Sequence, residues 1–102
     1  MRYVIKVAYD GTAYGGWQIQ NNSVTVQEKL TQALNSVIGG GVTVKASGRT
    51  DAGVHAAGQI CHFDAMTTIP PEKIADALNT VLPQDISVLA SAAAPDGFDA
   101  QS

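Results

Sequence analysis

The sequence predicts an α+β fold whose elements follow the order β-α-β-β-α-β. Three observations indicate this class: short runs of alternating apolar residues, two stretches with apolar residues at helical spacing, and breaks rich in glycine or proline between them. At 102 residues and 45% hydrophobic content, the chain is long enough for one small domain with its own core. We therefore expect residues 1–102 to form a single subdomain.

The first half of the chain predicts a strand, a long loop and a helix. Residues 2–9 alternate as in a half-buried strand, with one face made of Tyr3, Ile5, Val7 and Tyr9. Residues 10–23 are rich in Gly, Asn and Gln, which indicates a loop. Thr25 and Glu28 have the spacing of a capping box, and an apolar stripe follows at helical spacing: Val26, Leu30, Ala33, Leu34, Val37 and Ile38. The three glycines at 39–41 should end this helix.

The second half predicts two strands, a helix and a last strand. Residues 42–47 and 58–64 should be strands, and Pro70-Pro71 should open a helix that stops at Pro83. Residues 85–91 alternate, with one side made of Ile86, Val88 and Ala90. This order fits a ferredoxin-like sandwich, with an antiparallel sheet that buries one face under two helices and leaves the other open for RNA or a partner domain. The residues expected between helices and sheet are Leu30, Leu34, Ile38, Leu78 and Val81.

The segment Gly48-Arg49-Thr50-Asp51-Ala52-Gly53-Val54-His55 is the strongest candidate for chemistry. It places an Arg, an Asp and a His in a glycine-bracketed stretch between two predicted strands. Such a loop on a rigid sheet can present a reactive carboxylate. By local chemistry alone, Asp in a glycine-flanked turn is more often a turn former that accepts backbone hydrogen bonds.

Three segments together resemble the tRNA pseudouridine synthase A family. GRTDAGVHA (48–56) looks like the family signature, in which the matching Asp is the essential catalytic residue. YDGTAYGGWQ (9–18) resembles a second family stretch, and GQICHFD (58–64), with Gln59, His62 and Phe63, resembles a third. The three matches come in the family's order and span most of the chain, so they favour the catalytic interpretation of Asp51.

The resemblance implies isomerisation of uridine to pseudouridine in the anticodon arm of tRNA. The glycosidic bond breaks, the base rotates and its C5 bonds to the same ribose carbon, which requires neither a redox cofactor nor a metal. A carboxylate such as Asp51 can attack the base, attack the sugar or remove a ribose proton, and the sequence leaves all three open. Arg49 resembles the family residue that fills the space left by the flipped base and contacts phosphate.

The remaining motif residues have supporting interpretations. We expect Thr50 to tie the Asp51 loop together, and His55 to orient that loop or to bind phosphate. Asp10 should bond backbone N–H groups of its own turn, and Gln18 should have a supporting role. Tyr14 and Trp17 either stack on RNA or close the core. Cys61 and His62 lie in an apolar strand, where a buried structural role is the default for both.

Family members are more than twice as long as this chain and are dimeric. The resemblance therefore implies that these residues form the N-terminal part of a homodimeric enzyme, whose C-terminal half supplies an aromatic residue that stacks on the uracil and a basic partner for the Asp. We expect this part alone to fold but to be inactive. Without that half, the carboxylate lacks most of the positioning that makes catalysis fast.

Composition and charge set further expectations. One cysteine excludes an internal disulfide, and the two histidines and one cysteine form no cluster with metal-ligand spacing, so we expect no metal and no cofactor. The N-terminal residues predict neither a signal peptide nor a membrane span, which points to the cytoplasm. The net charge of −3 argues against tight RNA binding, although Lys6, Lys45 and Arg49 can form a local positive stripe.

Two other classes of function compete with this interpretation. Asp10-Gly11-Thr12 after a strand resembles the aspartate-nucleophile phosphatases of the haloacid dehalogenase family, but those enzymes need an Asp where this chain has Ala8. The other is a non-catalytic ferredoxin-like module that binds RNA or a partner through its open sheet face. An RNA-recognition module needs outward aromatic residues on its central strands, and the third predicted strand offers only Phe63.

Overall fold

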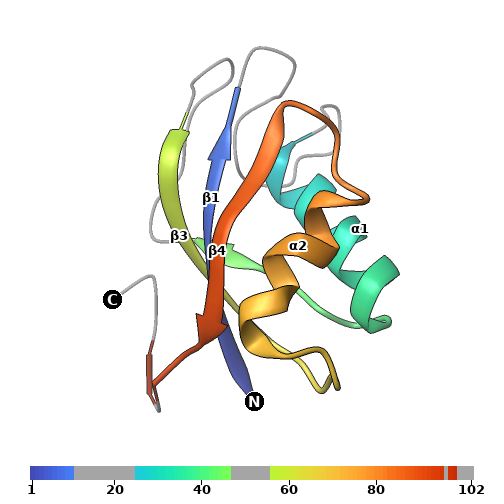
Figure 1. Ribbon diagram of the computed structural model, residues 1–102, viewed down its shortest axis with the longest axis vertical. Helices are drawn as coiled ribbons and strands as arrows, with labels where there is room; N and C mark the ends of the chain where they lie inside the picture. Colours follow the sequence, from blue (N-terminus) through green and yellow to red (C-terminus); the bar gives the residue numbers. More distant parts are fainter. Residues whose placement is uncertain (11–24, 47–55, 96, 99–102) are drawn as a thin grey trace.

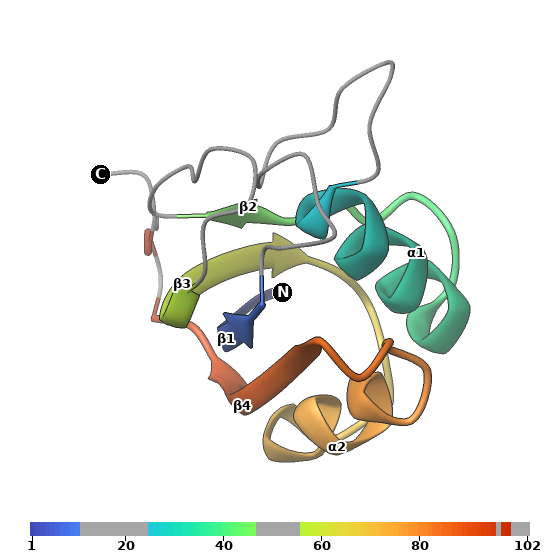
Figure 2. The ribbon, with the colours of Figure 1, turned by 90° about the horizontal axis from the view of Figure 1, so that it is seen from above.

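The fold is a four-stranded antiparallel sheet with two helices on one face (Figures 1 and 2). The computed structural model describes residues 1–10, 25–46, 56–95 and 97–98. Its elements are β1 (Arg2–Tyr9), α1 (Val26–Ile38), β2 (Lys45–Ala46), β3 (Ala56–Asp64), the 3₁₀ turn η2 (Pro71–Lys73), α2 (Ile74–Asn79) and β4 (Ile86–Ala93). The predicted α+β class is confirmed, and the strand order β2-β3-β1-β4 fits the ferredoxin-like arrangement.

The core lies between the helices and one face of the sheet. All four residues of the predicted inner face of β1 are buried, and they pack against apolar residues of both helices. Tyr3 and Phe63 stack there with ring centroids 5.5 Å apart. The other fully buried side chains include Leu30, Leu34 and Leu78, as predicted. No helix formed by the described residues covers the opposite face of the sheet (Figure 2), and we call it the open face.

Helix α1 begins and ends where the sequence predicts. The Thr25 hydroxyl accepts a hydrogen bond from the Glu28 backbone N–H at 3.3 Å, which satisfies one of the free donors of the first turn. At the other end, Gly39 has φ 123° and donates its N–H to the Asn35 carbonyl. A side chain is strained at this φ, so glycine is the residue that lets the chain leave the helix here.

The second helix is shorter than predicted, and the expected burial of Val81 is wrong. The chain enters through η2, and α2 ends at Asn79, whose side chain bonds both backbone groups of Val88 at 2.8 and 2.9 Å. After this point Val81 and Leu82 both direct their N–H to the Leu78 carbonyl, so the chain tightens into a turn. Leu82 then packs against the core, while Val81 is 47% exposed. Ile38 is also only partly buried.

The second strand begins later than predicted, and its described ladder comprises Lys45 and Ala46. Val42 and Val44 are nevertheless buried, as the alternation predicted. Side chains of α1 replace the missing ladder bonds, because Asn35 accepts from the Val42 N–H at 2.9 Å and Gln27 donates to the Val44 carbonyl at 2.8 Å.

In β4 the predicted placement of Ala90 beside Ile86 and Val88 is wrong. Val88 pairs with Val7 but Ala90 pairs with Lys6, so Leu89 is an extra residue that forms a β-bulge. The bulge reverses the alternation, and Ala90 becomes exposed. Ser91 faces the helices instead, where its hydroxyl accepts from the Ala75 N–H and donates to the Pro71 carbonyl.

Candidate functional site

One motif segment continues from the end of β1 at the same place where the other joins the start of β3. Residue 10 continues from the C-terminal end of β1, and residues 47–55 connect β2 to the start of β3. Tyr9 is paired with Ala56 on one side and with Ile86 on the other, and the Asp10 N–H donates to the Asp85 carbonyl at 2.9 Å. Because β1 and β3 are antiparallel, the C-terminal end of β1 and the N-terminal end of β3 meet at the upper end of the sheet in Figure 1.

Most of the predicted site residues lie outside the part of the chain that the structure describes. This holds for Arg49, Thr50, Asp51 and His55, and for Tyr14, Trp17 and Gln18. Asp10 is described and is exposed at the end of β1. The structure therefore brings together the end of β1, after which the first segment continues, and the start of β3, where the second segment finishes. The proximity of the predicted side chains stays a prediction.

A side-chain hydrogen bond joins these two strand ends. The Tyr9 hydroxyl donates to Gln59 Oε1 at 2.9 Å, and the Tyr9 ring is buried. The bond lies where the register between β1 and β3 shifts, between Val7 and Tyr9, so a side-chain pair supports the ladder at its irregular point. Sequence reasoning named Gln59 as a motif residue but assigned it no role. The sequence does hold an indication of this role, because Gln59 is a polar residue on the same face of β3 as Cys61 and Phe63.

At the other end of the open face, charged groups are paired. Arg2 contacts Asp64 through two hydrogen bonds of 2.8 and 2.9 Å, and Arg2 Nη1 also donates to the Phe98 carbonyl. The hydrogen bond from Arg2 is the main reason that the pKa of Asp64 lies below its ordinary value. The Phe98 ring meets His62 edge-on at 6.2 Å, and His62 is buried although it belongs to the open face.

In the described part of the chain, neither the cysteine nor a cluster of metal-ligating side chains forms a site. Cys61 is buried, and burial raises the pKa of its thiol to about 12, so it remains a thiol at neutral pH and is a poor nucleophile. Among the described residues, no three His, Cys, Asp or Glu side chains lie close enough together to hold a metal ion.

None of the described helices has the length and apolar character needed to cross a membrane.

Comparison with known proteins gives a consistent match. The model of a family described as tRNA pseudouridine synthase matches residues 5–101. Proteins named tRNA pseudouridine synthase A from Rhodopseudomonas palustris and Shouchella clausii are 45% and 50% identical to this chain over 101 residues each. The one from a Thermoanaerobacter species is 49% identical over 98 residues.

The matches cover nearly all of this chain but less than half of each relative. They include 98%, 98% and 96% of the chain, and 41%, 39% and 40% of the three relatives in the same order. The chain thus spans about two fifths of the length of the curated relatives that it matches.

Proposed function

The chain belongs to the tRNA pseudouridine synthase family, and on that premise we propose that the whole protein isomerises uridine to pseudouridine in tRNA with Asp51 as the catalytic carboxylate. The observation that carries the proposal is the match over residues 5–101, which includes the GRTDAGVH segment and both other motif segments.

The reaction needs an ionised group at the junction of base and sugar. The bond between N1 and the ribose C1′ breaks, a bond between C5 and C1′ forms, the C5 hydrogen leaves as a proton, and N1 gains a proton. The isomerisation changes no oxidation state. A carboxylate is ionised at neutral pH and can act as nucleophile or base, so Asp51 is suited to the step without a cofactor.

The geometry of the sheet supports a shared site for the two motif segments. Because Tyr9 and Ala56 are paired, residues that follow β1 and residues that precede β3 start from adjacent backbone positions. In the proposal Arg49 takes the place of the flipped base and contacts phosphate, since a base in a stacked arm must leave its stack to react. The residues proposed to hold or line the site are Asp10, Tyr14, Trp17, Gln18, Thr50 and His55.

The proposal includes finer features that the family resemblance implies. The substrate is a uridine of the anticodon arm, the protein acts in the cytoplasm as a homodimer, and it uses no cofactor. Other residues of the whole protein supply the aromatic group that stacks on the uracil and the basic partner of Asp51. For the 102 residues alone we expect no turnover on unmodified tRNA, because positioning contributes much of the rate.

The test is Asp51→Asn in the full-length protein, with tRNA tritiated at uracil C5 as substrate. Formation of the C5–C1′ bond releases the tritium into water, so the wild type should release it and the variant should not. Binding of tRNA by the variant should stay close to that of the wild type, because the loss lies in the chemical step. Asp76→Asn is the matched control, since it removes an exposed carboxylate on α2. Tritium release by Asp51→Asn at the wild-type rate would refute the role of Asp51.

The position of the modified base is tested separately. Cleaving the reacted tRNA into fragments and locating pseudouridine in each should place it in the anticodon arm. Pseudouridine confined to another arm would leave the chemistry intact and refute the proposed substrate position.

A further inference from the structure

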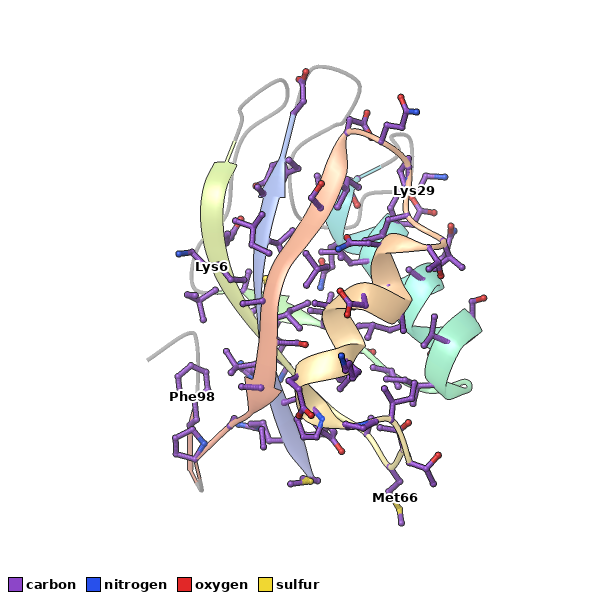
Figure 3. The ribbon with its side chains drawn as sticks, viewed as in Figure 1. Lys6, Lys29, Met66 and Phe98 are labelled. Carbon is purple, nitrogen blue, oxygen red and sulfur yellow. The ribbon has the colours of Figure 1, made fainter. Side chains whose placement is uncertain are left out.

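Lys6 lies across β3 because residue 58 has no side chain. A Cβ built on Gly58 would come within 2.8 Å of Lys6 Cε, closer than two such atoms can stand. The direct cross-strand partner of Lys6 is Ile60, and Gly58 is two residues further toward the start of β3. The lysine therefore leans diagonally toward the end of the sheet where residues 47–55 join β3. Figure 3 shows Lys6 on the open side, away from Lys29 near α1.

The ammonium group of Lys6 has no partner in the described part of the chain. Among the described residues no carboxylate or carbonyl bonds it, and its side chain is exposed. Lys45 is likewise exposed, and it belongs to the same face, since its cross-strand partner His62 also pairs with Val4. Two lysines of the predicted positive stripe thus lie on the open face, and the third member, Arg49, is outside the described residues.

The chain is acidic overall, but most of the acidic groups that the structure describes lie away from the open face. Within the described residues, Asp64 is the one carboxylate on the open face, and Arg2 neutralises it. The others are on the helices, η2 or the loops at the end of the sheet: Asp10, Glu28, Glu72, Asp76 and Asp85. Among the described residues, the open face therefore carries a local positive charge although the net charge of the chain is −3. Such a local field attracts a polyanion even when the total charge is unfavourable.

The surface next to Lys6 is hollow and mostly apolar. A depression of about 240 Å³ is lined by residues of three strands, among them Lys6, Ile60 and Ala90. The bulge at Leu89 and the small side chains of Ala90 and Ala92 leave this space open on the β4 side. A cation beside an apolar hollow matches a nucleotide, whose phosphate is anionic and whose sugar and base present apolar faces.

We propose that Lys6 binds a backbone phosphate of the tRNA and that Gly58 directs it there by leaving room over β3. This inference rests on the proposed function, because it takes the partner to be tRNA. Lysine acts here as a point charge on a flexible stem, which suits a phosphate whose exact position is set by other contacts. The contact adds affinity without reading sequence, and it holds the RNA beside the sheet end that bears the Asp51 segment.

The experiment measures tRNA binding by the full-length protein over a range of salt concentrations. For Lys6→Gln, one lost phosphate contact should reduce the slope of log affinity against log salt by about 0.7–0.9, which corresponds to about a fivefold to eightfold loss at 0.1 M salt. Lys73→Gln is the matched control, because Lys73 is also exposed but lies in η2 on the helix side. It should bind as the wild type does.

Gly58→Ala tests the position of the Lys6 side chain without removing its charge. The added methyl meets the far end of a flexible side chain, so it should displace Lys6 and leave the melting temperature nearly unchanged. We expect Gly58→Ala to weaken tRNA binding although the lysine is still present, and to add no further loss to Lys6→Gln. Wild-type affinity for Gly58→Ala would overturn the role of Gly58.

The outcomes also separate this inference from the proposed function. An unchanged affinity and salt slope for Lys6→Gln would overturn the phosphate contact, even if Asp51→Asn remains inactive. Conversely, a normal rate of tritium release by Asp51→Asn would refute the catalytic assignment without affecting the binding measurement. An equal loss for Lys6→Gln and Lys73→Gln would mean that only total charge matters, which also overturns the proposal.

Discussion

Leu34→Ala is the sharpest test of the core between α1 and the sheet. Leu34 is fully buried in the described structure. The substitution removes three carbons, which at about 0.8 kcal/mol each contribute about 2.4 kcal/mol of lost burial. Close packing prevents full collapse around the deleted atoms, and the remaining cavity raises the expected loss of unfolding free energy to about 3–5 kcal/mol. That is a large fraction of the stability of a small domain.

Urea unfolding of the 102-residue chain measures this loss, and the chain provides a matched control. Leu89→Ala deletes the same atoms from a side chain that is 54% exposed at the bulge, so it should change the unfolding free energy by less than about 1 kcal/mol. Leu34→Met keeps the volume of the core and should cost under about 1.5 kcal/mol. If Leu34→Ala and Leu89→Ala lost the same amount of stability, the burial of α1 against the sheet would be wrong.

Two further predictions concern ionisable groups. Because burial raises the pKa of Cys61 to about 12, iodoacetamide at pH 8 should modify the folded chain on the order of 10³-fold more slowly than the urea-unfolded chain; equal rates would show that the thiol is accessible. The pKa of Asp64 is lowered in the folded state, chiefly by the Arg2 hydrogen bond, so its contribution to stability is present above the ordinary value of 3.8 and is lost as the pH falls below it. Asp64→Asn should therefore be slightly less stable than the wild type at pH 7 and equal to it at low pH, and a difference that persists at low pH would contradict this origin.

Structure that depends on neighbours in sequence was predictable. The Thr25 cap and the Gly39 stop of α1 use bonds within a single turn, so residue types at short spacing were enough to locate them. The alternation of β1 likewise predicted its buried face. Alternation failed in β4, because a bulge depends on how two strands pair, and the residues of one strand do not reveal it.

For the candidate site, too, some features could be predicted from the sequence and others depended on the tertiary structure. The motif segments alone identified the candidate catalytic and binding residues and the family that these segments resemble. The sequence by itself therefore determined the order of elements, the helix caps and the identity of the candidate groups, because these depend on residue type and short spacing. Only the tertiary structure decided that Tyr9 lies beside Ala56 and Gln59, that Leu82 replaces Val81 in the core, and that Lys6 crosses Gly58. These contacts join residues whose meeting depends on strand register and on the packing of the helices against the sheet, and both arise only when the whole chain folds.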